Sequence, residues 1–188
     1  MNDEQFTLYK FRPINKYLIE SLVTRSLYFA KLDELNDPFD CRIDLEGALK
    51  RAELSAIGDR KKFLSSFLDD PNKFQHWQSY ISNVGACSFS RVNANTLLWV
   101  HYADAHRGVC LEYKFQSSYF LPPEFNLTVA GNVEYLQEPL TEWLKNAPIE
   151  SAPFAEGLIH RYFKTKSPAW CYEMEARIIR TKHGVCNI

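Results

Sequence analysis

One short stretch of the chain holds the first group of side chains that could do chemistry: His101, Tyr102 and Asp104. A helical pattern here predicts that His101 and Asp104, three residues apart, share one face of a helix that ends at Gly108. A carboxylate beside an imidazole orients the ring, so His101 is a candidate base or ligand, with Tyr102 as a second candidate catalytic residue. The alternative is that His101 and Tyr102 are half-buried helix residues whose polar atoms bond to neighbouring backbone.

A second group of candidates lies in residues 172–179, whose alternating pattern predicts a strand. Glu173, Glu175 and Arg177 then project from one face of that strand at intervals of roughly 6–7 Å. If this face lines a cleft, neighbouring like charge raises the pKa of one carboxyl and the arginine lowers that of the other, which prepares an acid and a base. If the face meets solvent, the same residues form a charge ladder that contributes little energy.

Aromatic and basic residues flank these two groups. Trp99 is expected in the core, with an aromatic wall for a planar ligand as the alternative, and Trp170 would give a cleft an apolar wall. Lys164 and Lys166 would supply positive charge for a phosphate group. These residues therefore extend the candidate site from catalysis to substrate binding.

The sequence offers little that would hold a metal ion. Asn36, Asp37 and Asp40 carry oxygen ligands, but Asn-Asp-Pro is typical of a turn that side-chain capping stabilises, and a regular oxygen-ligand loop is missing. The cysteines lack metal-ligand spacing and are expected to be small core side chains. They are Cys41, Cys87, Cys110, Cys171 and Cys186. We therefore predict no metal site.

The elements that must position the candidates are strands and helices in irregular order. Alternating or short apolar patterns predict strands at 8–12, 27–30, 84–90, 109–115, 129–136 and 172–179. Helical spacing predicts helices after Pro13 with Tyr17, Leu18 and Leu22 as a stripe, in two pieces over 45–68, after Asp70-Pro71, around His101, and around Phe154, Leu158 and Tyr162. The regular alternation of strand, helix and strand that is typical of a doubly wound fold is absent. We therefore expect one α+β domain over residues 1–188, with a mixed or antiparallel sheet and several flanking helices.

Composition sets the remaining limits. The 188 residues are 46% hydrophobic, enough for one substantial core, and the net charge of −1 gives no overall attraction to nucleic acid or to an anionic membrane. The first residues are acidic and polar, unlike a secretory signal, and no run approaches the ~18 apolar residues of a membrane span. We expect a cytoplasmic protein, and composition leaves open its oligomeric state and whether it binds a small molecule or a macromolecule.

Several stretches, taken in order, resemble the bacterial domain-of-unknown-function family 2971 (DUF2971). They are LYKFR at 8–12, LYFA at 27–30 with LNDPFD at 35–40, CSFS at 87–90, LWVHYAD at 98–104, RGVCLEY at 107–113 and KSPAWCYEMEAR at 166–177. Members of that family are typically bacterial, are often carried on mobile elements and include longer chains, so the resemblance implies a C-terminally shortened member. It implies a family without implying an activity.

The order of elements also resembles, more distantly, that of ADP-ribosyltransferase toxins, in which a split sheet surrounds a cleft for NAD. The shared features are strand, helix, strand at the start and a glutamate on a late strand, whereas the serine pair of this chain departs from the usual Ser-Thr-Ser form. The resemblance assigns phosphate binding to Lys10 or Arg12, support of the cleft to Ser88 or Ser90, and stabilisation of an oxocarbenium-like transition state to Glu173 or Glu175.

Three functions follow from these patterns as hypotheses. The leading one is an ADP-ribosyltransferase-like, NAD-using enzyme that acts in conflict between bacteria and mobile elements or phages. The alternatives are a non-catalytic module that binds a ligand or a protein, and a metal-dependent nuclease or hydrolase built from Asp37, Asp40, His101, Asp104 and the late glutamates. An enzyme requires that the central helix and the late strand meet around one accessible cavity.

Overall fold

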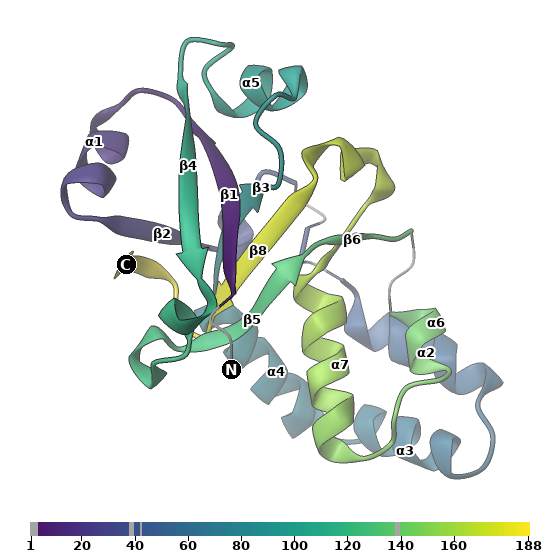
Figure 1. Ribbon diagram of the computed structural model, residues 1–188. Helices are drawn as coiled ribbons and strands as arrows, with labels where there is room; N and C mark the ends of the chain where they lie inside the picture. Colours follow the sequence, from purple (N-terminus) through teal and green to yellow (C-terminus); the bar gives the residue numbers. More distant parts are fainter. Residues whose placement is uncertain (1–3, 38–39, 42, 138–139) are drawn as a thin grey trace.

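One antiparallel sheet organises the fold in the computed structural model, which describes residues 4–37, 40–41, 43–137 and 140–188. Its strands are β1 (Gln5–Arg12), β2 (Ser26–Lys31), β3 (Gly85–Ser90), β4 (Val109–Gln116), β5 (Leu127–Asn132), β8 (Glu175–Arg180) and β9 (Gly184–Asn187). One path through the sheet runs β4-β1-β3-β2-β9, and β8 pairs with the other edge of β3 and then with β5 (Figure 1). β3 is therefore the strand on which both halves of the sheet meet.

The sheet is split along one edge of β3. β1 pairs with β3 only where Tyr9 faces Ser90, and β2 pairs with β3 only at the opposite end, where Ala30 faces Ala86. Between these two points, neither β1 nor β2 pairs with residues 87–89. The two strands therefore diverge from β3 and leave room for side chains, or for a ligand, between them.

Helices cover one side of the sheet and continue beyond it (Figure 1). They are α2 (Leu45–Ser55), α3 (Gly58–Leu68), α4 (Pro71–Asn83), α6 (Thr141–Leu144) and α7 (Ser151–Phe163). Tyr162 and Phe163 of α7 belong to one buried cluster with Val129 of β5 and Ile179 of β8. A second cluster lies among the helices themselves and includes Leu49, Leu64, Leu144 and Phe154. After α7, the chain forms β7 (Thr165–Lys166), which pairs in parallel with β6 (Glu134–Tyr135).

Two short helical segments complete the region around the split edge. α5 (Thr96–Tyr102) follows β3 and begins at Asn95, whose side chain caps the amide of Leu97. The 3-10 helix η4 (Pro168–Glu173) follows β7 and leads directly into β8. Both segments lie at the end of β3 where Ser90 meets β1, so they can deliver side chains to the split.

The N-terminal helix differs from the predicted one. α1 (Lys16–Val23) begins after Asn15, which caps the amide of Leu18, so Pro13 is not in its first turn. Leu18 is its buried residue, whereas Tyr17 and Leu22 are more than half exposed. The predicted apolar stripe therefore does not form one packed face.

The predicted α+β class with an antiparallel sheet and flanking helices is confirmed, and several predicted boundaries are wrong. The helix that contains His101 ends at Tyr102 because Asp104 and the two residues after it take left-handed backbone conformations. The last strand of the sheet core begins at Glu175 and not at residue 172, and residues 129–136 divide between β5 and β6. β9 was not predicted.

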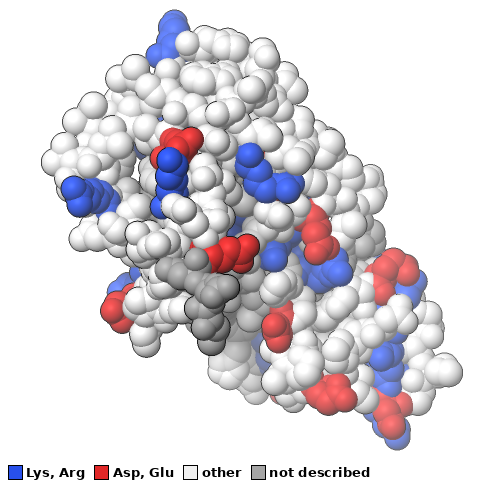
Figure 2. Space-filling view, in the orientation of Figure 1, with Lys and Arg blue, Asp and Glu red and all other residues white. Residues whose placement is uncertain are grey.

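The described helices include none with the length and apolar character needed to cross a membrane. On the face shown in Figure 2, basic and acidic side chains are interspersed. The surface visible there therefore agrees with the nearly balanced charge of the sequence.

Candidate functional site

A pocket of about 580 Å³ occupies the split between β1 and β2. Its walls come from five parts of the chain: β1, β2 with the segment after it, β3, α5, and the β7–η4–β8 region. Ten of the residues proposed from the sequence line it: Lys10, Arg12, Ser88, Ser90, His101, Tyr102, Asp104, Lys166, Glu173 and Glu175. The central helix and the start of the late strand therefore meet around one cavity, as an enzymatic function requires.

A buried network of charges forms one wall of this pocket. Lys166 Nζ lies 2.7 Å from Glu173 Oε2, 3.2 Å from Glu175 Oε2 and 3.6 Å from Asp40 Oδ2. The side chain of Lys166 is 7% exposed, and burial opposes its charge, but the three carboxylates raise the pKa of Lys166 above its usual value. Lys166 is therefore a fixed positive charge that holds the carboxylates together.

Arg177 completes the network from behind the pocket. Its Nε and Nη2 donate to the two oxygens of Glu175, at 2.5 and 3.0 Å, and Nη1 donates to Asp40 Oδ1 at 2.8 Å and to the Phe163 carbonyl at 3.1 Å. Arg177 is 1% exposed and does not line the pocket. The planar guanidinium can satisfy two carboxylates at once, which explains why an arginine suits this position better than a lysine would.

Glu173 reaches the network by a different route from the one predicted. It is the last residue of η4, so the prediction that Glu173, Glu175 and Arg177 share one strand face is wrong for Glu173. Met174 takes a left-handed backbone conformation (φ 47°), and the buried Ser90 hydroxyl donates to the Glu173 carbonyl oxygen at 2.7 Å. This turn directs both glutamates toward Lys166 although only one of them is on β8.

The two glutamates have opposite pKa shifts. Burial raises the pKa of Glu173 above its usual value, and Lys166 and the Tyr102 hydroxyl offset only part of this effect. Burial also opposes the charge of Glu175, but Arg177 and Lys166 outweigh it and lower the pKa of Glu175 to about 2. The site therefore combines a carboxyl group with a raised pKa and one that stays ionised, an arrangement that suits acid and base chemistry.

Tyr102 is the residue of α5 that contacts this pair. Its Oη donates to Glu173 Oε1 at 2.6 Å, and burial together with this carboxylate raises the pKa of Tyr102 above its usual value. The hydroxyl therefore stays protonated and can donate a hydrogen bond at neutral pH.

The predicted orientation of His101 by Asp104 is wrong. Asp104 lies beyond the end of α5 with φ 49°, and its carboxylate pairs with Arg107 at 3.0 Å. His101 is exposed, and its ring lies 6.2 Å from the ring of Tyr172. Both His101 and Asp104 line the pocket, but they lie on its exposed side and act separately.

The two basic residues of β1 have different surroundings. Lys10 Nζ donates to the Ser88 carbonyl at 2.7 Å and lies 5.0 Å from the centre of the Phe89 ring, so its position depends on β3. Among the described residues, no carboxylate lies within ion-pair distance of Arg12. Arg12 therefore remains available to an anionic group that enters the pocket.

The two serines of β3 also differ. Ser90 donates to the Glu173 carbonyl and accepts from the Val92 amide at 3.1 Å, so its hydroxyl stabilises the turn at Met174. The Ser88 side chain helps to lower the pKa of Glu175 and so favours its charged form. Of the two, Ser88 acts directly on a charged group of the site.

Trp99 and Trp170 do not line the pocket. Trp99 packs edge-on against Phe11, with ring centres 5.3 Å apart, and its indole N–H donates to the Asn93 carbonyl. The Trp170 ring lies 4.9 Å from Lys166 Nζ. Trp99 is thus a half-buried packing residue at the edge of the core and not a core residue. Trp170 contacts the charge network and does not form the predicted apolar wall.

The role of Asp40 was missed. The sequence suggested a capping turn or a metal ligand, whereas Asp40 bonds to Arg177 and lies close to Lys166. No group of metal-binding side chains occurs among the described residues, and the carboxylates of the network already face two cations. Pro38 and Phe39 of the same motif lie outside the described residues. The sequence shows Asp40 as an aspartate in a polar loop, but its partner Arg177 is 137 residues away along the chain, so no local pattern indicates the ion pair.

Comparison with protein families supports the resemblance given by the motifs. The family model described as a protein of unknown function (DUF2971) matches residues 98–178. That segment runs from α5 to β8 and includes Tyr102, Lys166, Glu173, Glu175 and Arg177. No curated protein and no solved structure matches the chain.

Proposed function

We propose that this member of the DUF2971 family is an ADP-ribosyltransferase-like enzyme that binds NAD in the split between β1 and β2 and cleaves its nicotinamide N-glycosidic bond. The observation that carries the proposal is the placement of the Glu173 carboxyl group in the pocket, bonded to Tyr102 and Lys166. Arg12, which has no ion-pair partner among the described residues, lies on the β1 wall of the same cavity. Carboxylates that face a reacting sugar and cations that face phosphates are the groups this chemistry needs.

Substrate binding follows from the β1 and β3 walls. A pocket of about 580 Å³ lies within the usual range of roughly 300–1,000 Å³ for small-molecule sites. The Arg12 guanidinium would bind the pyrophosphate with two parallel hydrogen bonds. Tyr9 and Tyr28 also line the pocket and would offer ring faces to the planar nicotinamide or adenine.

Glu173 is better suited than Glu175 to act on the ribose. Both oxygens of Glu175 are bonded to Arg177, so that carboxylate serves mainly to fix Lys166 and Arg177. Glu173 faces the pocket, and the positive charge of the nicotinamide ring would favour its ionised form once substrate is bound. The ionised group would then stabilise the positive charge that develops at C1′ of the ribose.

The reaction would have two stages at C1′ of the ribose, in which one bond breaks and another forms. The bond between C1′ and the nicotinamide nitrogen breaks, and the nicotinamide leaves as a neutral molecule with the bonding electron pair. Water or an acceptor group then forms a bond to C1′ and loses a proton, which Glu173 or solvent accepts. Tyr102 and Lys166 keep the Glu173 carboxyl group in place during both stages.

The test is release of nicotinamide from NAD by the purified chain, together with calorimetry of NAD binding. We expect Glu173→Gln to lower the release rate by roughly 100-fold or more while NAD still binds, because the change removes stabilisation of the transition state. We expect Arg12→Gln to weaken NAD binding by about tenfold because it removes a phosphate contact. The matched controls are Glu112→Gln and Lys61→Gln, which lie outside the pocket and should change neither quantity.

Two results would reject the proposal. If NAD does not bind to the folded protein, the pocket serves another ligand. If NAD binds but Glu173→Gln cleaves it at the rate of the unmodified chain, the residue is not catalytic and a binding module becomes the better hypothesis. Circular dichroism of each variant separates these results from loss of the fold.

The same proposal includes the setting that the family resemblance implies. We place the enzyme in the bacterial cytoplasm, as a single domain that acts in conflict with mobile elements or phages. Consumption of NAD would fit that setting, because it affects a whole cell without a sequence-specific target. Expression of the unmodified chain and of Glu173→Gln in a bacterial host tests it, since only the former should lower cellular NAD.

A further inference from the structure

A second cavity of about 590 Å³ lies away from the candidate site, between α1, the end of β4 and the final strand β9. Its wall includes the aromatic side chains of Tyr113, Phe115, Tyr119, Phe120 and Phe125. We propose that this cavity binds a single-chain fatty acid, whose tail packs on these rings and whose carboxylate pairs with Arg25. The proposal is independent of NAD chemistry.

The cavity exists because two strand edges face it without a strand between them. Among the described strands, β4 pairs only with β1, and β9 pairs only with β2. Both contribute lining residues, from Tyr113 to Phe115 on β4 and from Cys186 to Ile188 at the end of the chain. The opening thus leads from the surface directly to the core side of the sheet.

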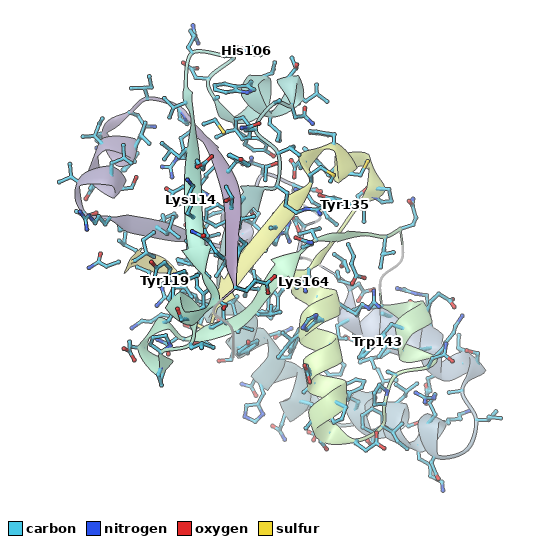
Figure 3. The ribbon with its side chains drawn as sticks, in the orientation of Figure 1. His106, Lys114, Tyr119, Tyr135, Trp143 and Lys164 are labelled. Atoms are coloured by element: carbon cyan, nitrogen blue, oxygen red, sulfur yellow. The ribbon has the colours of Figure 1, made fainter. Side chains whose placement is uncertain are left out.

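The floor of this opening is part of the aromatic core. Phe115, Phe120 and Phe125 are each less than 8% exposed and belong to one buried cluster. The centres of the Phe120 and Phe125 rings lie 5.1 Å apart, and those of Phe115 and Phe120 lie 5.3 Å apart. Exposed Leu22 of α1 and exposed Tyr119 also line the cavity and extend its apolar surface outward. Tyr119 is labelled in Figure 3. A flexible hydrocarbon chain can follow such a surface from solvent to the core.

The charged groups at the rim favour an anionic head group. Arg25 and Lys114 line the cavity with one acidic residue, Glu124. Lys114 is paired with Glu112 at 3.2 Å. Arg25 is exposed with φ 49°, and within the described part of the chain no carboxylate lies at ion-pair distance from it. A carboxylate next to Arg25 would form an ion pair with the guanidinium, for which the described residues supply no partner.

Isothermal calorimetry with monomeric dodecanoate tests the proposal, and dodecanol provides the same tail without the charge. Leu22→Glu places a carboxylate in the apolar wall and should weaken dodecanoate binding by more than about tenfold. Val23→Glu is the matched control, because Val23 is exposed on the same helix but does not line the cavity. It should leave binding within roughly twofold of the unmodified chain, since its carboxylate stays in solvent.

Arg25→Asn tests the head-group contact, because asparagine tolerates the left-handed backbone of this position. We expect roughly fivefold weaker binding of dodecanoate and no change for dodecanol, since only the former has a charge to pair. Lack of dodecanoate binding to the folded chain would overturn the proposal. Equal effects of Leu22→Glu and Val23→Glu would also overturn it, because binding would then occur elsewhere on the surface.

Discussion

Two cavities lined by described residues have nearly equal volumes, about 580 and 590 Å³, and walls of opposite chemical character. The cavity between β1 and β2 is bounded by a buried network of three carboxylates and two cations. The cavity between β4 and β9 is bounded mainly by aromatic and aliphatic side chains. Both arise from the same cause, which is that strands of one sheet diverge and leave an edge unpaired.

The two walls differ in the interactions that keep them stable: the charged wall needs paired charges, and the aromatic wall needs close packing. A buried charge is tolerated only when partners surround it, and no buried side-chain nitrogen or oxygen within the described residues lacks a hydrogen-bond partner. The charged wall therefore depends on Asp40, Lys166 and Arg177 together. The aromatic wall depends on packing alone, which tolerates substitutions of similar volume. The first cavity should be rigid and sensitive to single changes, and the second should adapt to its ligand.

The largest effect that we expect comes from Arg177→Met in the charged wall. The change leaves Glu175 and Asp40 buried without the guanidinium that pairs with both. Removal of one member of a buried ion pair costs about 3–5 kcal/mol, so the free energy of unfolding should fall by that amount. Urea denaturation measures it, with Arg107→Met as an exposed control that should change stability by less than ~0.5 kcal/mol. A loss below about 1 kcal/mol for Arg177→Met would show that the network does not hold the wall together.

A second prediction concerns the pH dependence that only the charged wall should have. The pKa of Glu175 falls from 4.5 to about 2 on folding, so the folded state holds fewer protons at this group than the unfolded chain between these values. The stability that Glu175 contributes is present above pH 4.5 and is lost as the pH falls toward 2, by on the order of 3 kcal/mol.

Comparison of the unmodified chain with Glu175→Gln reports this contribution together with the change at neighbouring Glu173, whose pKa the Glu175 charge helps to raise. The difference in unfolding free energy between the two should shrink as the pH is lowered from 4.5 toward 2. Leu22→Gln in the aromatic wall is the comparison variant, and its difference from the unmodified chain should stay constant over the same range. A pH-independent difference for Glu175→Gln would contradict the assigned pKa shift.

The sequence predicted those elements whose signals are local. Asp70 followed by Pro71 predicted the start of α4, and the alternation from Val109 onward predicted β4, because capping and side-chain period act within a few residues. The same logic failed at Met174, where the turn depends on a hydrogen bond from Ser90 to the Glu173 carbonyl, 83 residues away along the chain. A single residue in a left-handed conformation makes β8 begin at Glu175, three residues later than the predicted start at residue 172.

The sequence indicated many of the residues that form the candidate site, but it did not indicate most of the contacts between them. Tyr102, Glu173 and Glu175 were chosen for their types and spacing, and they line one pocket. Lys166 was expected to bind phosphate, whereas three carboxylates of the protein surround it. The pairing of Asp40 with Arg177 joins segments that share no local pattern, so only the fold reveals it. Their catalytic roles remain predictions that the NAD experiments test.

The smallest effect expected is that of Tyr102→Phe, which removes the hydrogen bond to Glu173 Oε1 and leaves the ring in place. One such bond is worth about 1 kcal/mol of unfolding free energy. Because the Tyr102 hydroxyl favours the ionised carboxylate, its loss should raise the pKa of Glu173 further, which a ¹³C NMR titration of labelled glutamate carboxyls would measure. Tyr119→Phe removes a hydroxyl at the aromatic cavity and should leave that titration unchanged. A lower pKa of Glu173 in Tyr102→Phe would mean that the tyrosine favours the protonated acid, and the proposed pairing of one proton-binding and one ionised carboxyl would then need a different origin.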